Sequence, residues 1–332
     1  MAPTLIHIHI PRTAGSTLNV VISESSPKHV QFLCALPEHE AALRAQTQEQ
    51  RDRIDCVFSH YPYGLHRLFT RPVLYTASVR EPRARIFSFW RFVLAREEHP
   101  LHAEVAVQGD DFSAFLRFAA DHSAIRGEVD NRQVRMLSGH MEMGAGHDDH
   151  LTAALGNIAA GNFELGVMDS VAGLLARIAH HLGIEIVQVP RLKARASDAA
   201  FAAALGTLAP DARELLDRFV SHDTILYAVA RDTVAGPLLR DAAAARRAAA
   251  AATPSSAGAP AAAPDVAAFV RGLYRALLLR EPDEAGFADY VAEMGEGLTC
   301  EDAIRRMLRS QEFAGKQREF ADAYRIVPYG TT

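Results

Sequence analysis

The chain has 332 residues, of which 49% are hydrophobic and 23% charged, a composition typical of globular proteins long enough for two domains. Its net charge of −5 argues against a nucleic-acid binder. Three scattered cysteines, Cys34, Cys56 and Cys300, provide neither a disulfide framework nor a paired-cysteine metal motif. No apolar run approaches the roughly 20 residues that cross a bilayer, so we expect a cytoplasmic protein without a membrane span.

Strands and helices alternate in the first part of the chain. Residues 4–10 alternate isoleucine with histidine and predict a strand, and the next residues enter a helix through small and hydroxyl side chains. Strands are predicted at 4–10, 55–60, 73–79 and 163–168, and helices at 14–24, around 37–52 and from Pro82 onward. This order predicts an α/β fold with a sheet flanked by helices.

The second part of the chain is mostly helical. Residues 111–230 show helical patterns around the strand at 163–168, and an Ala/Pro-rich stretch follows at 241–264. We therefore expect one domain over 1–240, a linker over 241–264 and a small all-α domain over 265–332.

The stretch HIHIPRTAGSTL, residues 7–18, has the composition of an anion site. A strand that ends in a glycine-containing turn and opens a helix directs unpaired backbone N–H groups and the helix dipole toward a ligand. Arg12 adds a positive charge, and Ser16 and Thr17 add hydroxyl groups. The alternative is that these two hydroxyls only cap the helix and Arg12 is solvated. The Walker lysine pattern is absent.

A second anion site is predicted at the end of the strand at 73–79. Arg80 follows that strand, and Ser88 lies two turns into the next helix, so a guanidinium and a hydroxyl could hold one phosphate. Two anion sites on neighbouring strand ends indicate a nucleoside with phosphate groups at both ends.

These motifs resemble the sulfotransferases related to heparan sulfate 2-O-sulfotransferase, over residues 4–232. HIPRTAGSTL resembles their 5′-phosphosulfate loop and VREPRARIFSFW their 3′-phosphate motif. The further matches, in order, are FSHYPYGLH, DNRQVRMLSG, FELGVMDSVAGLLARIAHHLGI and DTILYAVA. The resemblance implies a P-loop-type parallel sheet and a sulfuryl donor, 3′-phosphoadenosine-5′-phosphosulfate (PAPS), which leaves as the product PAP, 3′-phosphoadenosine-5′-phosphate.

Site residues follow from the resemblance by position. The 5′-phosphosulfate would be held by Pro11, Arg12, Thr13, Ala14, Gly15, Ser16 and Thr17, and the 3′-phosphate by Arg80 and Ser88. Arg12 stands where the family has lysine, a catalytic position, and the chain has only three lysines among its 35 basic residues. The bulky planar guanidinium differs from a compact ammonium, which puts the donor geometry or the rate in question.

His60 is the expected general base, because a hydroxyl acceptor near neutral pH must lose a proton and histidine suits that role. His66 is the fallback. Acceptor-binding candidates, besides His66, are Arg85, Asn131 and Gln133. The His- and Asp-containing stretch 139–150 has no familiar metal-ligand spacing, so we expect no metal.

Residues 265–315 resemble a helical bacterial module, the domain of unknown function 4214, which we expect to dock a partner or to self-associate. The whole chain is therefore predicted to be a PAPS-dependent sulfotransferase that acts on a hydroxyl, most simply of a carbohydrate. Two rivals stay open: a nucleotide-dependent phosphotransferase, and a non-catalytic glycan-binding protein whose donor site has decayed.

Overall fold

A computed structural model describes residues 3–25, 29–33, 37–143, 147–160, 162–168, 171–184, 195–231, 266–278, 280–298, 300–308 and 310–312. The predicted linker, 241–264, lies outside these residues.

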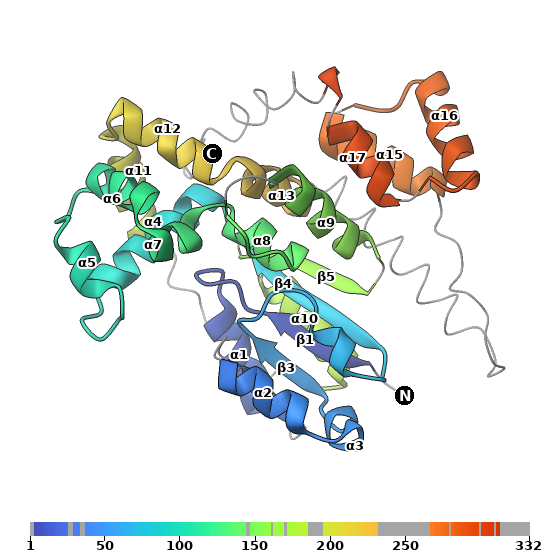
Figure 1. Ribbon diagram of the computed structural model, residues 1–332, viewed down its shortest axis with the longest axis horizontal. Coiled ribbons are helices and arrows are strands. Elements are labelled where there is room, and N and C mark those ends of the chain that lie inside the picture. The colour runs from blue at the N-terminus through green and yellow to red at the C-terminus, as the bar shows by residue number, and fades with distance from the viewer. Residues whose placement is uncertain are drawn as a thin grey trace.

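A five-stranded parallel sheet forms the centre of the molecule (Figure 1). Its strands are β1 (Thr4–Ile8), β2 (Val30–Leu33), β3 (Cys56–Ser59), β4 (Val73–Val79) and β5 (Phe163–Val167), in the order β2-β3-β1-β4-β5. The chain leaves the central strand β1 for one side of the sheet and later returns on the other side at β4. Open parallel sheets bind ligands where the strand order reverses in this way, at the carboxyl ends of the strands.

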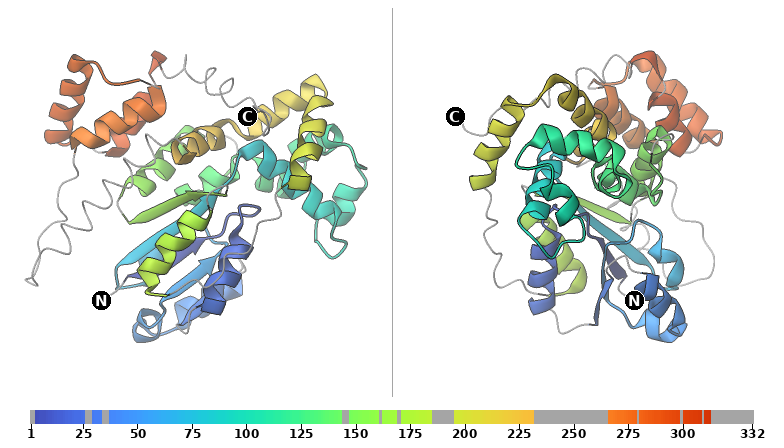
Figure 2. Two further views of the ribbon diagram at one scale, coloured as in Figure 1. Left: turned by 180° about the vertical axis from the view of Figure 1, so that it is seen from behind. Right: turned by 60° about the vertical axis from the view of Figure 1, so that its left-hand side comes forward.

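The alternation of side chains along β1 directs them into two separate cores. Ile6 and Ile8 face the core under α8 (Arg132–Ser138), α9 (His147–Ala159) and α13 (Ser221–Arg231). Leu5 faces the opposite core, under α1 (Gly15–Ser25) and α10 (Val171–Leu182). Both faces of the sheet are therefore covered by helices, as two-sided burial of a parallel sheet requires (Figures 1 and 2).

The predicted strands are confirmed with small differences. The first ends at Ile8 rather than at residue 10, because Ile10 N–H donates back to the Ile8 carbonyl in a turn. Strand β2 was not predicted, since four residues, VQFL, are too few to show a period. Three short elements lie around β3: α2 (Pro37–Ala45), α3 (Gln48–Asp52) and the 3₁₀ helix η1 (Leu65–Leu68).

A helical layer extends from the end of β4. Helix α4 (Pro82–Leu94) begins with Pro82 in its first turn, as predicted, and Glu81 caps it by accepting from the N–H groups of Arg83 and Ala84. Its aromatic side chains, among them Trp90, pack with apolar side chains of the neighbouring helices. These helices are α5 (His102–Ala106), α6 (Phe112–Asp121), α7 (Ser123–Val129), α11 (Arg195–Gly206) and α12 (Pro210–Phe219).

The small all-α part packs on the layer above the sheet. Its helices are α15 (Val266–Leu278), α16 (Glu284–Gly295) and α17 (Cys300–Leu308). Helix α17 lies against α9, and α15 lies against α13 (Figure 1). Ile304 and Met307 of α17 belong to the same apolar cluster as Leu155 and Ile158 of α9. The C-terminal helices therefore share a core with the sheet domain.

Truncation of Ile304 tests this shared core. Ile304→Ala removes a buried side chain, and we expect a loss of about 2–5 kcal/mol in the free energy of unfolding. The chain has one tryptophan, Trp90, which lies in the distant layer around α4, so its fluorescence reports the sheet domain. Denaturant unfolding followed at Trp90 should shift with Ile304→Ala and not with Glu296→Ala, an exposed position. An unchanged Trp90 transition would show that the two parts unfold independently.

Candidate functional site

The loop after β1 has the backbone geometry of an anion site. Arg12 and Ala14 adopt left-handed conformations, with φ of 73° and 71°, and Thr13 between them donates its hydroxyl to the Ile10 carbonyl over 2.8 Å. Alternation of this kind turns successive N–H groups toward one concave side. Helix α1 starts at Gly15, so its positive dipole end adds to the same side. Ser16 and Thr17 lie in the first turn of α1, and their side chains lie outside the described part.

A histidine packs directly under the first residue of α1. A Cβ atom on Gly15 would lie 1.9 Å from the His9 ring, so only glycine allows this approach. The His9 ring also lies against the His60 ring, with 4.3 Å between centroids and an interplanar angle of 34°. His9 thus contacts both the start of α1 at Gly15 and the predicted base, His60.

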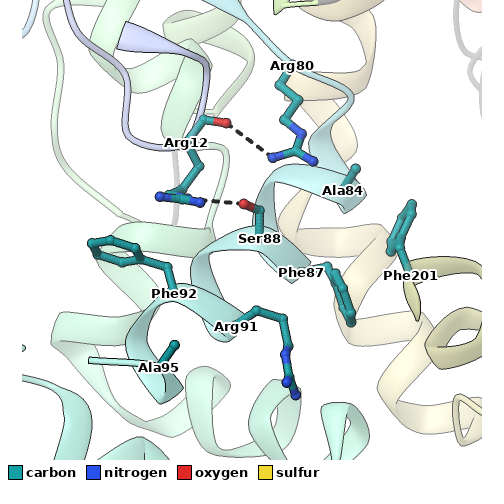
Figure 3. A pocket seen from close by; sticks show the side chains of 9 residues that line it. All are labelled: Arg12, Arg80, Ala84, Phe87, Ser88, Arg91, Phe92, Ala95 and Phe201. Carbon is teal, nitrogen blue, oxygen red and sulfur yellow. Dashed lines mark hydrogen bonds between the residues drawn. The ribbon is translucent and has the colours of Figure 1, made fainter. Parts of the chain in front are cut away.

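Side chains from the loop and from α4 meet at one cavity of about 320 Å³ (Figure 3). Arg12 Nε donates to Ser88 Oγ over 3.1 Å, and the Arg12 guanidinium lies 4.5 Å from the centre of the Phe92 ring. Arg80 Nη1 donates to the Arg12 carbonyl at 3.4 Å. The cavity is lined by Arg12, Arg80, Ala84, Phe87, Ser88, Arg91, Phe92, Ala95 and Phe201. The two predicted anion motifs therefore come together, on the neighbouring strands β1 and β4.

Positive charge at this cavity is only partly neutralised by the protein. Burial lowers the pKa of Arg12 below its ordinary value, and the nearby positive charges of Arg80 and Arg96 lower it further. Arg91 pairs with Asp110, and Arg96 with Glu98, but among the described residues no carboxylate pairs with Arg12. Arg12 is also half-buried and packs against the Phe92 ring, so it is not fully solvated. A bound anion would supply the missing negative charge.

Gln133 holds Arg80 in place. Its side-chain amide accepts from the Arg80 N–H at 2.9 Å and donates to the Arg80 carbonyl at 3.0 Å. Gln133 lies in the first turn of α8, where Asp223 accepts from the N–H groups of Gln133 and Val134. In return, Asn131 caps α13 by accepting from the N–H groups of His222 and Asp223. Gln133 and Asn131 are both fully buried, and their role in acceptor binding stays a prediction.

The other two acceptor candidates also have contacts within the protein. Arg85 is fully buried, its Nη2 donates to the Glu128 carbonyl at 2.6 Å, and burial lowers its pKa to about 10. His66 Nδ1 lies 3.0 Å from the Tyr75 hydroxyl, and its ring lies against Tyr63. Neither residue lines the cavity around Arg12.

His60 is held in a form suited to accept a proton. It follows β3, where its N–H donates to the Leu33 carbonyl. Burial lowers its pKa, nearby Arg132 lowers it further, and Glu128 opposes the shift. The imidazole is therefore neutral near pH 7. His60 does not line the described cavity but is linked to the loop through His9.

Sequence reasoning missed Phe92, His9 and Asp223 as parts of this site. Phe92 follows Ser88 by four residues, so helical spacing alone places it on the same face of α4. An acidic residue in the first turn of a helix, as Asp223 is in α13, is a weak sign of capping within that helix. Here the Asp223 carboxylate instead accepts from a backbone N–H group of another helix, α8. His9 lies in the stretch predicted as a strand, and no sequence signal shows that its ring lies under Gly15.

A double-mutant cycle tests the contact between Gly15 and His9. Gly15→Ala alone forces a Cβ atom into the His9 ring, and we expect it to lower the free energy of unfolding by about 1–3 kcal/mol. In a His9→Ala background the same change meets no ring, and alanine is favoured in a helix by about 1 kcal/mol, so its effect should reverse sign. Denaturant titrations of the four proteins measure this, and equal effects in both backgrounds would refute the contact.

The buried histidines make stability depend on pH. Burial and neighbouring imidazoles lower the pKa of His7 to about 3 and of His9 to about 4, whereas an unfolded histidine titrates near 6.5. Both residues thus stabilise the fold fully above pH 6.5, and this stability is lost as pH falls toward 4. Each contributes a slope of about 1.4 kcal/mol per pH unit.

Denaturant unfolding at pH 7, 6 and 5 should show this decline. His9→Asn should reduce the slope, and His29→Ala, at an exposed position, should leave it unchanged. A free energy of unfolding that stays flat from pH 7 to 5 would contradict the burial of neutral imidazoles.

Comparisons with known proteins identify only the C-terminal helices. The family model for a domain of unknown function, DUF4214, matches residues 255–317, which contain α15, α16 and α17, and confirms the resemblance predicted there. Neither the curated proteins nor the solved structures include a match to the chain. Within the described residues, no helix is long and apolar enough to cross a membrane, and no three His, Cys, Asp or Glu side chains are grouped to hold a metal ion.

Proposed function

We propose that the protein is a PAPS-dependent sulfotransferase that transfers a sulfuryl group to a hydroxyl, most simply on a carbohydrate. The observation that carries this proposal is the meeting of Arg12, Arg80 and Ser88 at one cavity beside the anion loop. The loop after β1 and the pair Arg80 and Ser88 meet at Arg12. Two such neighbouring elements suit one ligand that carries a phosphate group at each end. The resemblance of ordered motifs over residues 4–232 supports the same ligand.

The position of the site in the sheet supports a P-loop-type architecture. The anion loop follows the central strand, β1, and Arg80 follows the adjacent strand, β4. Both lie at the carboxyl edge, where the strand order reverses and where open α/β sheets bind nucleotides. The Arg-rich cavity also contains the rings of Phe87, Phe92 and Phe201, and such apolar walls suit the base or sugar of a nucleotide.

The donor, PAPS, would supply an activated sulfuryl group whose bond to the 5′-phosphate breaks as the acceptor oxygen bonds to sulfur. Neutral His60 takes the proton of the acceptor hydroxyl. The loop N–H groups and the N-terminus of α1 stabilise the negative charge that the departing 5′-phosphate gains. Gln133 keeps Arg80 aligned, so the nucleotide is held while the acceptor approaches.

One observation favours a second candidate, a glycan-binding protein with a decayed donor site. Arg12, which stands in place of the family's lysine, extends to Ser88 on α4. If the hydrogen bond between Arg12 and Ser88 does not open to admit a nucleotide, the protein keeps its fold but cannot bind the donor.

Ligand-dependent thermal stability distinguishes the candidates. We expect PAP at 100 times its dissociation constant to stabilise the protein by about 2.7 kcal/mol and ATP with Mg²⁺ to have little effect. The reverse result would support a phosphotransferase. Stabilisation by neither nucleotide would support the decayed site and contradict our proposal.

His60→Ala tests the base. We expect the rate of sulfuryl transfer from labelled PAPS to a panel of desulfated glycans to fall by about 10²- to 10⁴-fold, with PAP affinity unchanged. His29→Ala, at an exposed position outside the cavity lining, is the control and should retain transfer. A fully active, folded His60→Ala protein would reject His60 as the base.

A further inference from the structure

The side chain of Arg12, a residue of the loop after β1, packs against helix α4. From its left-handed backbone position, Arg12 reaches Ser88 at 3.1 Å and covers the Phe92 ring at 4.5 Å (Figure 3). Ser88 and Phe92 are one helical turn apart on α4, and both line the cavity. Arg12 is therefore built into the second anion site, although it belongs to the loop of the first.

The packing of Arg12 uses features that a lysine lacks. A guanidinium is planar, so it can stack on an aromatic ring while its edge donates hydrogen bonds. In the described structure Nε is engaged by Ser88, and the two Nη groups make no hydrogen bond with any described residue. Ala84 and Ala95 line the same cavity with small side chains.

We propose that Arg12 binds the 3′-phosphate of the nucleotide together with Arg80 and Ser88, and does not act on the 5′-phosphosulfate. This inference rests on the proposed function and refines the role of one residue in it. Two guanidiniums and a hydroxyl then meet one dianionic phosphate, whose charge offsets the repulsion between Arg12 and Arg80. The 5′-phosphosulfate is left to the loop N–H groups and the N-terminus of α1.

The consequence is selectivity. A nucleotide with a 3′-phosphate gains charge-assisted hydrogen bonds from both arginines, and one without it gains neither. Each such hydrogen bond to a charged group changes affinity by about 10- to 100-fold. Arg12 should therefore determine how strongly the protein prefers PAP to adenosine 5′-phosphate, which carries only the 5′-phosphate.

Calorimetric titration of both ligands into the full chain tests the assignment. For Arg12→Ala we expect PAP affinity to fall by about 10- to 100-fold and adenosine 5′-phosphate affinity to change by less than about threefold. Arg80→Ala is the reference and should show the same selective loss. Phe92→Leu, which keeps the charge but removes the ring under it, should give a smaller selective loss, of about 3- to 10-fold.

Several outcomes would overturn the inference. Equal losses for both ligands in Arg12→Ala would place Arg12 on the 5′ side, and unchanged PAP affinity would remove it from the site. If the unmodified protein binds neither nucleotide, the proposed function itself fails and the inference falls with it. Thermal unfolding followed at Trp90 shows whether each variant is folded. Arg12→Lys adds a further check, because a lysine that restores activity without restoring the preference for PAP would also contradict the assignment.

Discussion

The junction between β4 and α4 depends on one buried amide. Gln133 forms two hydrogen bonds with the backbone of Arg80, at the point where the strand ends and the chain turns into the helix. The direction of α4 depends on this turn, and α4 presents Ser88 and Phe92 to Arg12. The helices that pack on α4 form their own core around Trp90 and Phe112. An amide buried without these partners would be costly, so the junction has one favourable arrangement.

Arginine residues near this junction have two different environments. Arg85 of α4 is fully buried, and burial lowers its pKa to about 10, although Asp223 and Glu128 nearby oppose this shift. Asp223 is buried as well, and although burial raises its pKa, its carboxylate accepts from two N–H groups of α8. Arg12 has no carboxylate of this kind among the described residues. Buried charge that the protein pairs stabilises its shape, whereas charge that it leaves unpaired at a cavity favours an anionic ligand.

The C-terminal helices join the same structure from the other side. Helix α17 lies against α9, which covers the face of the sheet that carries Ile6 and Ile8. Gly286 in this part resembles Gly15 in the loop, because a Cβ atom there would lie 2.4 Å from the Tyr274 hydroxyl. At both positions the absence of a side chain allows an aromatic residue to approach the first turn of a helix closely.

Periodicity and local motifs alone determined much of this protein. They predicted four of the five strands, the helix after Pro82 and the small helical part at the C-terminus. They also placed Arg12 after the first strand and Arg80 with Ser88 after β4, and the role of these residues in anion binding stays a prediction. These features are local, since a strand or a loop followed by a helix is encoded by adjacent residues. Only the tertiary structure decided that Arg12 turns to α4, that Gln133 holds Arg80, and that His9 links Gly15 to His60. Each of these contacts joins elements through space, and a side chain's direction there depends on the packing of neighbours far along the chain.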